Sequence, residues 1–164
     1  MKELFERINF RKILKYLLYM FLALVAQTMV LGQIRVMGVA PMLLPAVAVA
    51  VGMFEGATLG SVFSLVMGIF ADMSFVENTT AFALIFPALS FASGFVSQFF
   101  INRRFFAFMG LSLAALFVTA VLQMLKTLAA DAWSIDMLVT VILQTLISLP
   151  PAAVAYFPPA RWIK

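Results

Sequence analysis

The sequence predicts an all-α protein, a polytopic membrane bundle of six transmembrane helices with both termini in the cytoplasm. Three observations predict this architecture: the composition, the lengths of the uncharged stretches and the placement of Lys and Arg. Of the 164 residues, 65% are hydrophobic and 11% are charged, whereas an average soluble domain is roughly 25% charged. A bilayer can solvate the apolar surface that so few charges could not cover. We therefore expect residues 1–164 to form a single integral membrane domain.

Six stretches of the chain carry no charged residue and mark the expected helices. A spanning helix needs about 20 apolar residues, with a usual range of about 17–25. Five stretches reach that length, and 56–71 reaches it by extending past Glu55 or Asp72. Because Glu55 alone separates the second stretch from the third, these two should form a tight helical hairpin. The stretches are 16–34, 36–54, 56–71, 78–102, 105–125 and 137–160.

The placement of Lys and Arg orients the six helices. With both termini inside, Arg35 and Lys126 are the only two of the 11 basic residues that fall outside. An excess of basic residues marks cytoplasmic segments. Residues 1–12 place Leu4, Phe5 and Ile8 at helical spacing among basic residues. This segment is either a short interfacial amphipathic helix on an anionic lipid surface or a frayed basic tail.

The residue types that most enzymes depend on are missing. The sequence contains no Cys and no His, which excludes Cys/His zinc sites, thiolate nucleophiles and imidazole bases. There is no G-x-x-x-x-G-K phosphate-binding loop. A membrane aspartyl protease needs two facing aspartates within the membrane, and only Asp72 is a plausible candidate. We expect no enzymatic activity, no metal and no cofactor, and nothing in the chain indicates a nucleic-acid partner.

Polar residues inside the expected spans have two interpretations. In membranes such groups often hydrogen-bond between helices, at about 0.6 kcal/mol on average. Alternatively they form a polar pocket, for which Arg35, Lys126 and Gln27 are the candidates, provided that they converge in space. The proline pair Pro158–Pro159 should end the last helix, because proline removes a backbone donor.

A series of small residues is the strongest pattern in the chain, and Asp72 continues its four-residue spacing. Residues four apart are neighbours on one helix face, and small ones let two backbones approach closely. Packing within the bundle is one interpretation, and docking of another membrane protein is the other. The series, called here the small-residue ridge, consists of Gly52, Gly56, Gly60, Ser64, Gly68 and Asp72.

At these residues the chain resembles the MreD family of bacterial rod shape-determining proteins. Segment 41–94 contains the similarity: Pro41 before an apolar run, Glu55-Gly56, and the sequence GIFADM at 68–73. That sequence matches the family's G-x-x-x-D element, and Gly94 fits a later family glycine. Size, helix count and the basic amino end agree over the whole chain.

The resemblance implies a non-enzymatic scaffold of the cell-elongation machinery in the bacterial cytoplasmic (inner) membrane. Its implied partners are an MreC-like single-pass membrane protein, membrane lipid and the peptidoglycan synthases of elongation. The family's six-helix fold also resembles the substrate-binding membrane subunits of energy-coupling-type vitamin transporters. A small-molecule binding or transport subunit is therefore the alternative, in which a vitamin carboxylate would pair with Arg35 or Lys126.

Overall fold

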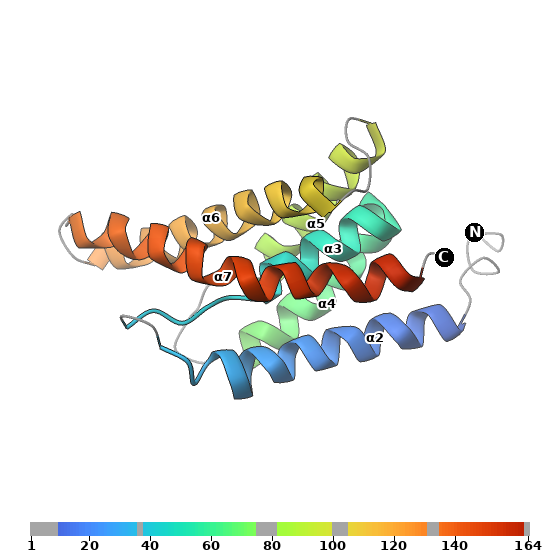
Figure 1. Ribbon diagram of the computed structural model, residues 1–164, viewed down its shortest axis with the longest axis horizontal. Helices are drawn as coiled ribbons and strands as arrows, with labels where there is room; N and C mark the ends of the chain where they lie inside the picture. Colours follow the sequence, from blue (N-terminus) through green and yellow to red (C-terminus); the bar gives the residue numbers. More distant parts are fainter. Residues whose placement is uncertain (1–9, 36–37, 75–81, 100–104, 131–134, 163–164) are drawn as a thin grey trace.

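The computed structural model describes residues 10–35, 38–74, 82–99, 105–130 and 135–162, and within them the chain is all-α. The expected amphipathic segment 1–12 lies largely outside these residues. Figure 1 shows the helices gathered into one bundle, with the first residue of α2 and the last of α7 at the same end. The six described α-helices are α2 (Phe10–Val25), α3 (Leu44–Glu55), α4 (Ala57–Ser74), α5 (Phe82–Phe99), α6 (Phe105–Ala130) and α7 (Ile135–Trp162).

Four stretches of the described helices are long and apolar enough to cross a membrane. They are Ile13–Leu31, Ala57–Ser74, Phe105–Met124 and Leu138–Pro159. The first combines α2 with a π-helical turn, η1 (Ala26–Leu31), which continues it without a break. The prediction of six helices is confirmed for the described residues, and four of these helices are long and apolar enough to span a membrane.

Helix α3 is the main departure from the predicted spans. The uncharged stretch 36–54 predicted a full span, yet the helix begins only at Leu44 and has 12 residues. At 1.5 Å per residue it is about 18 Å long, well short of a hydrocarbon layer of about 30 Å. The backbone before it is not helical, since Pro41 disfavours helix in the preceding residue, and Pro45 lies in the first turn.

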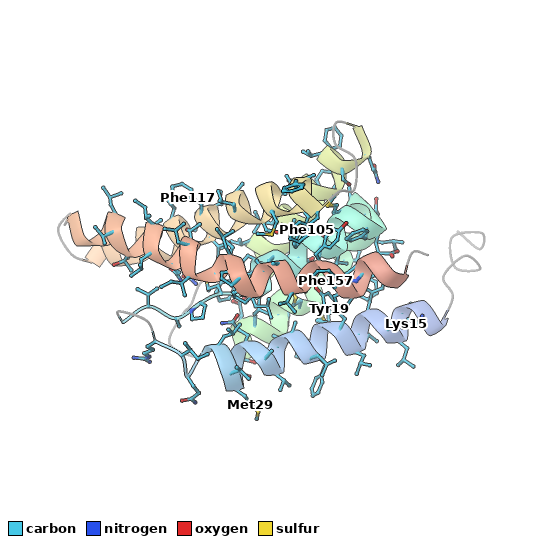
Figure 2. All side chains as sticks on the ribbon, viewed as in Figure 1. Lys15, Tyr19, Met29, Phe105, Phe117 and Phe157 are labelled. Carbon is cyan, nitrogen blue, oxygen red and sulfur yellow. The ribbon has the colours of Figure 1, made fainter. Side chains whose placement is uncertain are left out.

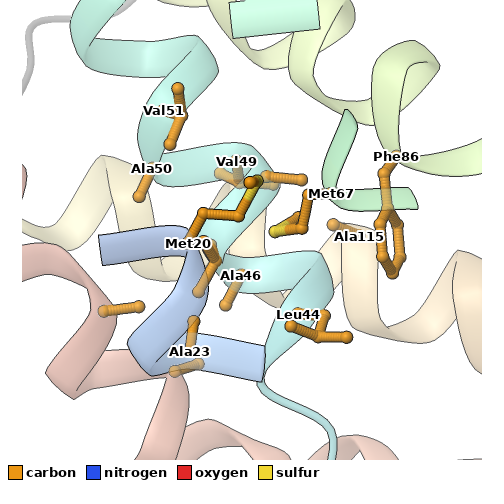
Figure 3. Close-up of a cluster of buried hydrophobic side chains, with 14 of the residues drawn as sticks. Met20, Ala23, Leu44, Ala46, Val49, Ala50, Val51, Met67, Phe86 and Ala115 are labelled. Atoms are coloured by element: carbon orange, nitrogen blue, oxygen red, sulfur yellow. The ribbon is translucent and has the colours of Figure 1, made fainter. Parts of the chain in front are cut away.

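The short helix α3 forms the centre of the bundle. Every residue from Leu44 to Phe54 is buried. Figure 3 shows Ala46 and Val49 of this helix near side chains from its neighbours. Those neighbours include Met20 of α2 and Met67 of α4, together with residues of α5 and α6. Helix α3 is hydrophobic all round because it is enclosed on every side.

Large apolar side chains point outward from the surrounding helices, as Figure 2 shows for Met29 and Phe117. Met29 is 71% exposed, Phe117 47% and Phe157 52%. Such a surface would be unfavourable in water over several helices. It is the surface expected where lipid is the solvent.

Helix α7 continues through Pro158 and Pro159, so the prediction that this pair ends the helix is wrong. Pro159 has no N–H to donate to the carbonyl four residues earlier, that of Ala155. The Tyr19 hydroxyl of α2 donates to this carbonyl instead, at 2.7 Å. A side chain from another helix thus replaces the missing backbone donor.

Candidate functional site

The small-residue ridge does not form one face of one helix. Gly56 interrupts it, so that Gly52 belongs to α3 and Gly60 to α4. The two glycines then face each other across the hairpin, since a Cβ on Gly60 would lie 2.5 Å from the Gly52 Cα atom. The ridge residues were expected to be neighbours on one helix, but Gly52 and Gly60 lie on two helices and face each other.

The turn between α3 and α4 depends on Gly56. Its φ of +90° is a conformation that side chains rarely adopt, and it is the single residue between the two helices. The preceding Glu55 accepts a hydrogen bond of 2.6 Å from the Tyr16 hydroxyl of α2. The predicted hairpin is confirmed, and α2 is bonded to it at the turn.

Helix α5 packs against both arms of this hairpin. A Cβ on Gly52 would lie 2.1 Å from the Ser90 carbonyl oxygen, and one on Gly94 would lie 2.5 Å from the Ala57 nitrogen. A hydrogen bond also joins α5 to α3, because the Ser93 hydroxyl donates to the Val49 carbonyl at 3.3 Å. Backbones approach this closely only where side chains are absent or small.

Gly68 and Asp72 contact the first residues of α5. A Cβ on Gly68 would lie 2.5 Å from the Phe82 carbonyl oxygen. The Asp72 carboxylate accepts two backbone hydrogen bonds, from Phe82 N to Oδ1 and from Ala83 N to Oδ2, each 3.0 Å. These are first-turn amides of α5, which have no partner within their own helix. Asp72 therefore caps a neighbouring helix, with a negative charge at its positive end.

Of the two interpretations of the ridge, the contacts in the structure are those of packing within the chain. Ser64 is 1% exposed, and the glycines of the ridge face α3 or α5. Docking of a partner on these particular residues stays a prediction, with the bundle's own backbone already filling the space.

A polar cavity lies at the end of the bundle away from the start of α2 and the end of α7. Its volume is about 290 Å³. Two of the three predicted pocket residues, Gln27 and Arg35, line it. The third, Lys126, lies on α6, but its side chain is outside the part of the chain that the structure describes. The lining residues are Gln27, Gly32, Arg35, Ala40, Pro41, Met42, Phe82, Gln123 and Gln144.

Gln27 forms one wall of the cavity through its backbone contacts. It belongs to the π-helical turn η1, and π-turns often occur at functional sites. Its Nε2 donates to the Pro41 carbonyl at 3.0 Å, and its Oε1 accepts from Leu43 N at 2.6 Å. Gln27 is 5% exposed, so it supplies buried hydrogen bonds to the non-helical segment before α3.

Gln123 and Gln144 also line the cavity, and the prediction of a pocket did not include them. The Gln144 Nε2 atom lies 3.4 Å from Gln123 Oε1, between α6 and α7. Gln123 lies near the end of α6 and Gln144 at a similar distance from the beginning of α7. That spacing was a usable signal, because residues equally far from the adjoining ends of two antiparallel helices lie at the same level of the pair.

A second concavity is apolar and opens between α2 and α4. Its volume is about 450 Å³. We call it the α2–α4 groove. The residues that line it are Leu17, Met20, Phe21, Leu24, Val25, Thr28, Phe70 and Ser74.

The described residues contain no group of three or more His, Cys, Asp or Glu side chains that could hold a metal ion. The long apolar helices, the lipid-compatible surface and the enclosed α3 define a multi-pass helical membrane protein. The sequence matches no protein-family model, no curated protein and no solved structure. A more specific role is therefore argued from the residues and their geometry.

Proposed function

We propose that this protein is a non-enzymatic scaffold of the bacterial cell-elongation complex, situated in the cytoplasmic (inner) membrane. Its direct partner is an MreC-like single-pass membrane protein, which connects it to the peptidoglycan synthases of elongation. One observation carries the proposal: the residues of the MreD resemblance take part in one packed unit of α3, α4 and α5. Gly68, Asp72 and Gly94 all have packing or capping contacts there, which suits a rigid support.

A scaffold needs a surface for its partner, and a single-pass protein offers one apolar transmembrane helix. The α2–α4 groove is a surface of that kind, since its lining is almost wholly apolar. Thr28 and Ser74 are the polar residues in it, and both hydroxyls already donate to carbonyls within their own helices. We place the partner's helix in this groove.

Co-expression with an MreC-like protein tests the proposal. The pair should purify together in detergent, and the chain alone should show no turnover. Because the sequence has no Cys, single introduced cysteines report contacts cleanly. Phe70→Cys in the groove should crosslink to a cysteine in the partner's helix. Phe117→Cys is the matched control, since Phe70 and Phe117 are 49% and 47% exposed.

The outcomes separate the groove from the scaffold function. Crosslinking at position 117 instead of 70 would move the interface to α6 and leave the scaffold function standing. Failure of the two proteins to purify together under any detergent or nanodisc condition would reject the scaffold function.

Membrane orientation is part of the proposal and has its own test. Nine of the 11 basic residues are cytoplasmic if both termini are inside. Cysteines at positions 78 and 131 should then react with an impermeant thiol reagent from outside intact cells, and one at 102 only after permeabilisation. Labelling of position 102 in intact cells would contradict this orientation or the number of membrane crossings.

The alternative, a substrate-binding subunit of an energy-coupling-type vitamin transporter, is favoured by the polar cavity. Such a subunit would purify with an ATPase module and bind a vitamin tightly in the absence of any single-pass partner. Co-purification therefore decides between the two functions.

A further inference from the structure

The polar cavity contains hydrogen-bonding groups that the fold does not use. Gln27 is not one of them, because both polar atoms of its side chain bond the backbone near Pro41. Gln123 is different. Its Nε2 atom is buried and has no hydrogen-bond partner among the residues that the structure describes. A buried donor without a partner is unfavourable. Because Gln123 lines the cavity, a rotation of its amide toward an acceptor bound there would satisfy this donor.

The amide alone does not identify the acceptor, because water can also occupy a cavity of about 290 Å³. The charge of the residues that line the cavity indicates which kind of acceptor binds. Arg35 is the only charged residue among the described residues that line the cavity, and no acidic side chain is among them. A guanidinium is always charged, and its planar set of donors matches the oxygens of a carboxylate or a phosphate.

Access and size agree with a small ligand or a head group. Arg35 is exposed, so the charged side of the cavity is open. Gln123 and Gln144 line the same cavity and are half-buried. The volume is close to the lower end of the range usual for small-molecule sites, roughly 300–1,000 Å³.

We propose that this cavity binds a small anionic group, a carboxylate or a phosphate, with Arg35 as its charge partner and the Gln123 amide as a buried donor. The anion comes either from a soluble molecule or from the head group of an anionic lipid. The site goes beyond the scaffold function and does not depend on it.

Two pairs of variants test the site in the full-length protein. Arg35→Gln removes the cavity's charge, and Lys15→Gln removes an exposed positive charge from the beginning of α2. Gln123→Leu removes the buried amide, and Gln33→Leu removes an exposed one that does not line the cavity. Each protein is placed in nanodiscs of phosphatidylcholine, with and without inorganic phosphate or glutarate, and in nanodiscs containing phosphatidylglycerol.

The measurement is the thermal unfolding temperature, which rises when a ligand binds the folded state. Phosphate, glutarate or phosphatidylglycerol should raise it in the wild type and in both controls. The apparent affinity should fall about tenfold or more in Arg35→Gln, as expected when a charged hydrogen-bonding partner is removed. Gln123→Leu should also weaken binding. Ligand-free unfolding of each variant shows whether the fold is intact.

The outcomes distinguish the sources of the anion. A shift with soluble anions in phosphatidylcholine identifies a soluble ligand, and a shift with phosphatidylglycerol alone identifies a lipid head group. Protection of a cysteine at position 40, which also lines the cavity, from thiol labelling by the same probe would localise the ligand. The proposal is wrong if none of these probes shifts the wild type, or if Arg35→Gln keeps the full shift.

Discussion

The bond between Tyr19 and Ala155 leads to a prediction about how this helix tolerates a proline pair. Tyr19 is 8% exposed and Ala155 is 3% exposed, so the 2.7 Å bond between them is buried. Tyr19→Phe removes the hydroxyl and leaves the Ala155 carbonyl without the donor that Pro159 cannot supply. A buried polar group left without a partner costs about 1–3 kcal/mol. We expect Tyr19→Phe to lower the free energy of unfolding by about that amount.

The expected cost exceeds what an ordinary interhelical hydrogen bond contributes in a membrane protein. Such bonds average about 0.6 kcal/mol and reach about 1.7 kcal/mol, because polar groups find other partners when the bond is broken. The Ala155 carbonyl has no alternative partner in its own helix while residue 159 is proline. The missing backbone donor is therefore what makes Tyr19 important.

A double-mutant cycle isolates this effect. Pro159→Ala restores an N–H that can reach the Ala155 carbonyl, so Tyr19→Phe should cost about 0.6 kcal/mol or less in that background. The assay is reversible unfolding in mixed micelles with increasing SDS, performed on the four proteins of the cycle. A coupling of about 1 kcal/mol between the two positions is the expected result.

The neighbouring proline supplies the control. Pro158→Ala makes the same chemical change one residue earlier, but the carbonyl that it serves belongs to Val154, which is 66% exposed. Tyr19→Phe and Pro158→Ala should therefore be additive. If Tyr19→Phe costs the same in the wild type and in Pro159→Ala, the reasoning about the missing donor fails.

Three further substitutions test other contacts of the bundle, each read by unfolding and by abundance in the membrane. Gly68→Leu should cost about 3 kcal/mol or more, because a Cβ at this position would lie only 2.5 Å from the nearest backbone atom of α5. Gly110→Leu is the control and should change stability by less than about 0.5 kcal/mol, since a Cβ there would have no neighbouring atom within 4 Å. Equal costs for the two variants would contradict the packing argument. Gln27→Leu should cost about 2 kcal/mol or more, because it leaves a buried carbonyl and a buried N–H unpaired; an unchanged protein would mean that other groups replace its bonds. Asp72→Asn should cost about 1–2 kcal/mol, because the amide keeps one acceptor for the two N–H groups of α5 and the negative charge at the start of that helix is lost. Glu77→Gln is the control for loss of charge alone and should behave like the wild type.

Several features of the fold could be predicted because they depend on local sequence. Uncharged stretches gave the number of helices, and Glu55 with Gly56 marked the hairpin turn. The four-residue spacing singled out Gly60, Gly68 and Asp72, which do make close or capping contacts. Spacing alone could not show that Gly56 would divide the series between two helices, because a single change of φ at one residue reverses the chain.

The length of α3 was missed because the absence of charge does not distinguish a spanning helix from a buried one. The run of Ala and Val from Ala46 to Val51 has no polar face, and such a helix is enclosed on all sides. Enclosure needs no particular length, whereas spanning does. The two prolines, Pro41 and Pro45, were the local evidence that the helix starts late.

The cavity and the short helix have a common origin. Since α3 begins only at Leu44, the residues before it are non-helical and would leave backbone polar groups unpaired inside the bundle. Non-helical backbone at membrane depth is tolerated only where protein or a water-filled cavity satisfies it. Gln27 satisfies Pro41 and Leu43, and Ser148 accepts a 2.8 Å bond from Met42 N. The late start of α3 thus requires polar side chains from η1 and α7 at this end of the bundle. Gln123 is a cavity residue that this requirement does not explain, and its Nε2 atom, which has no partner among the described residues, supports the proposed ligand.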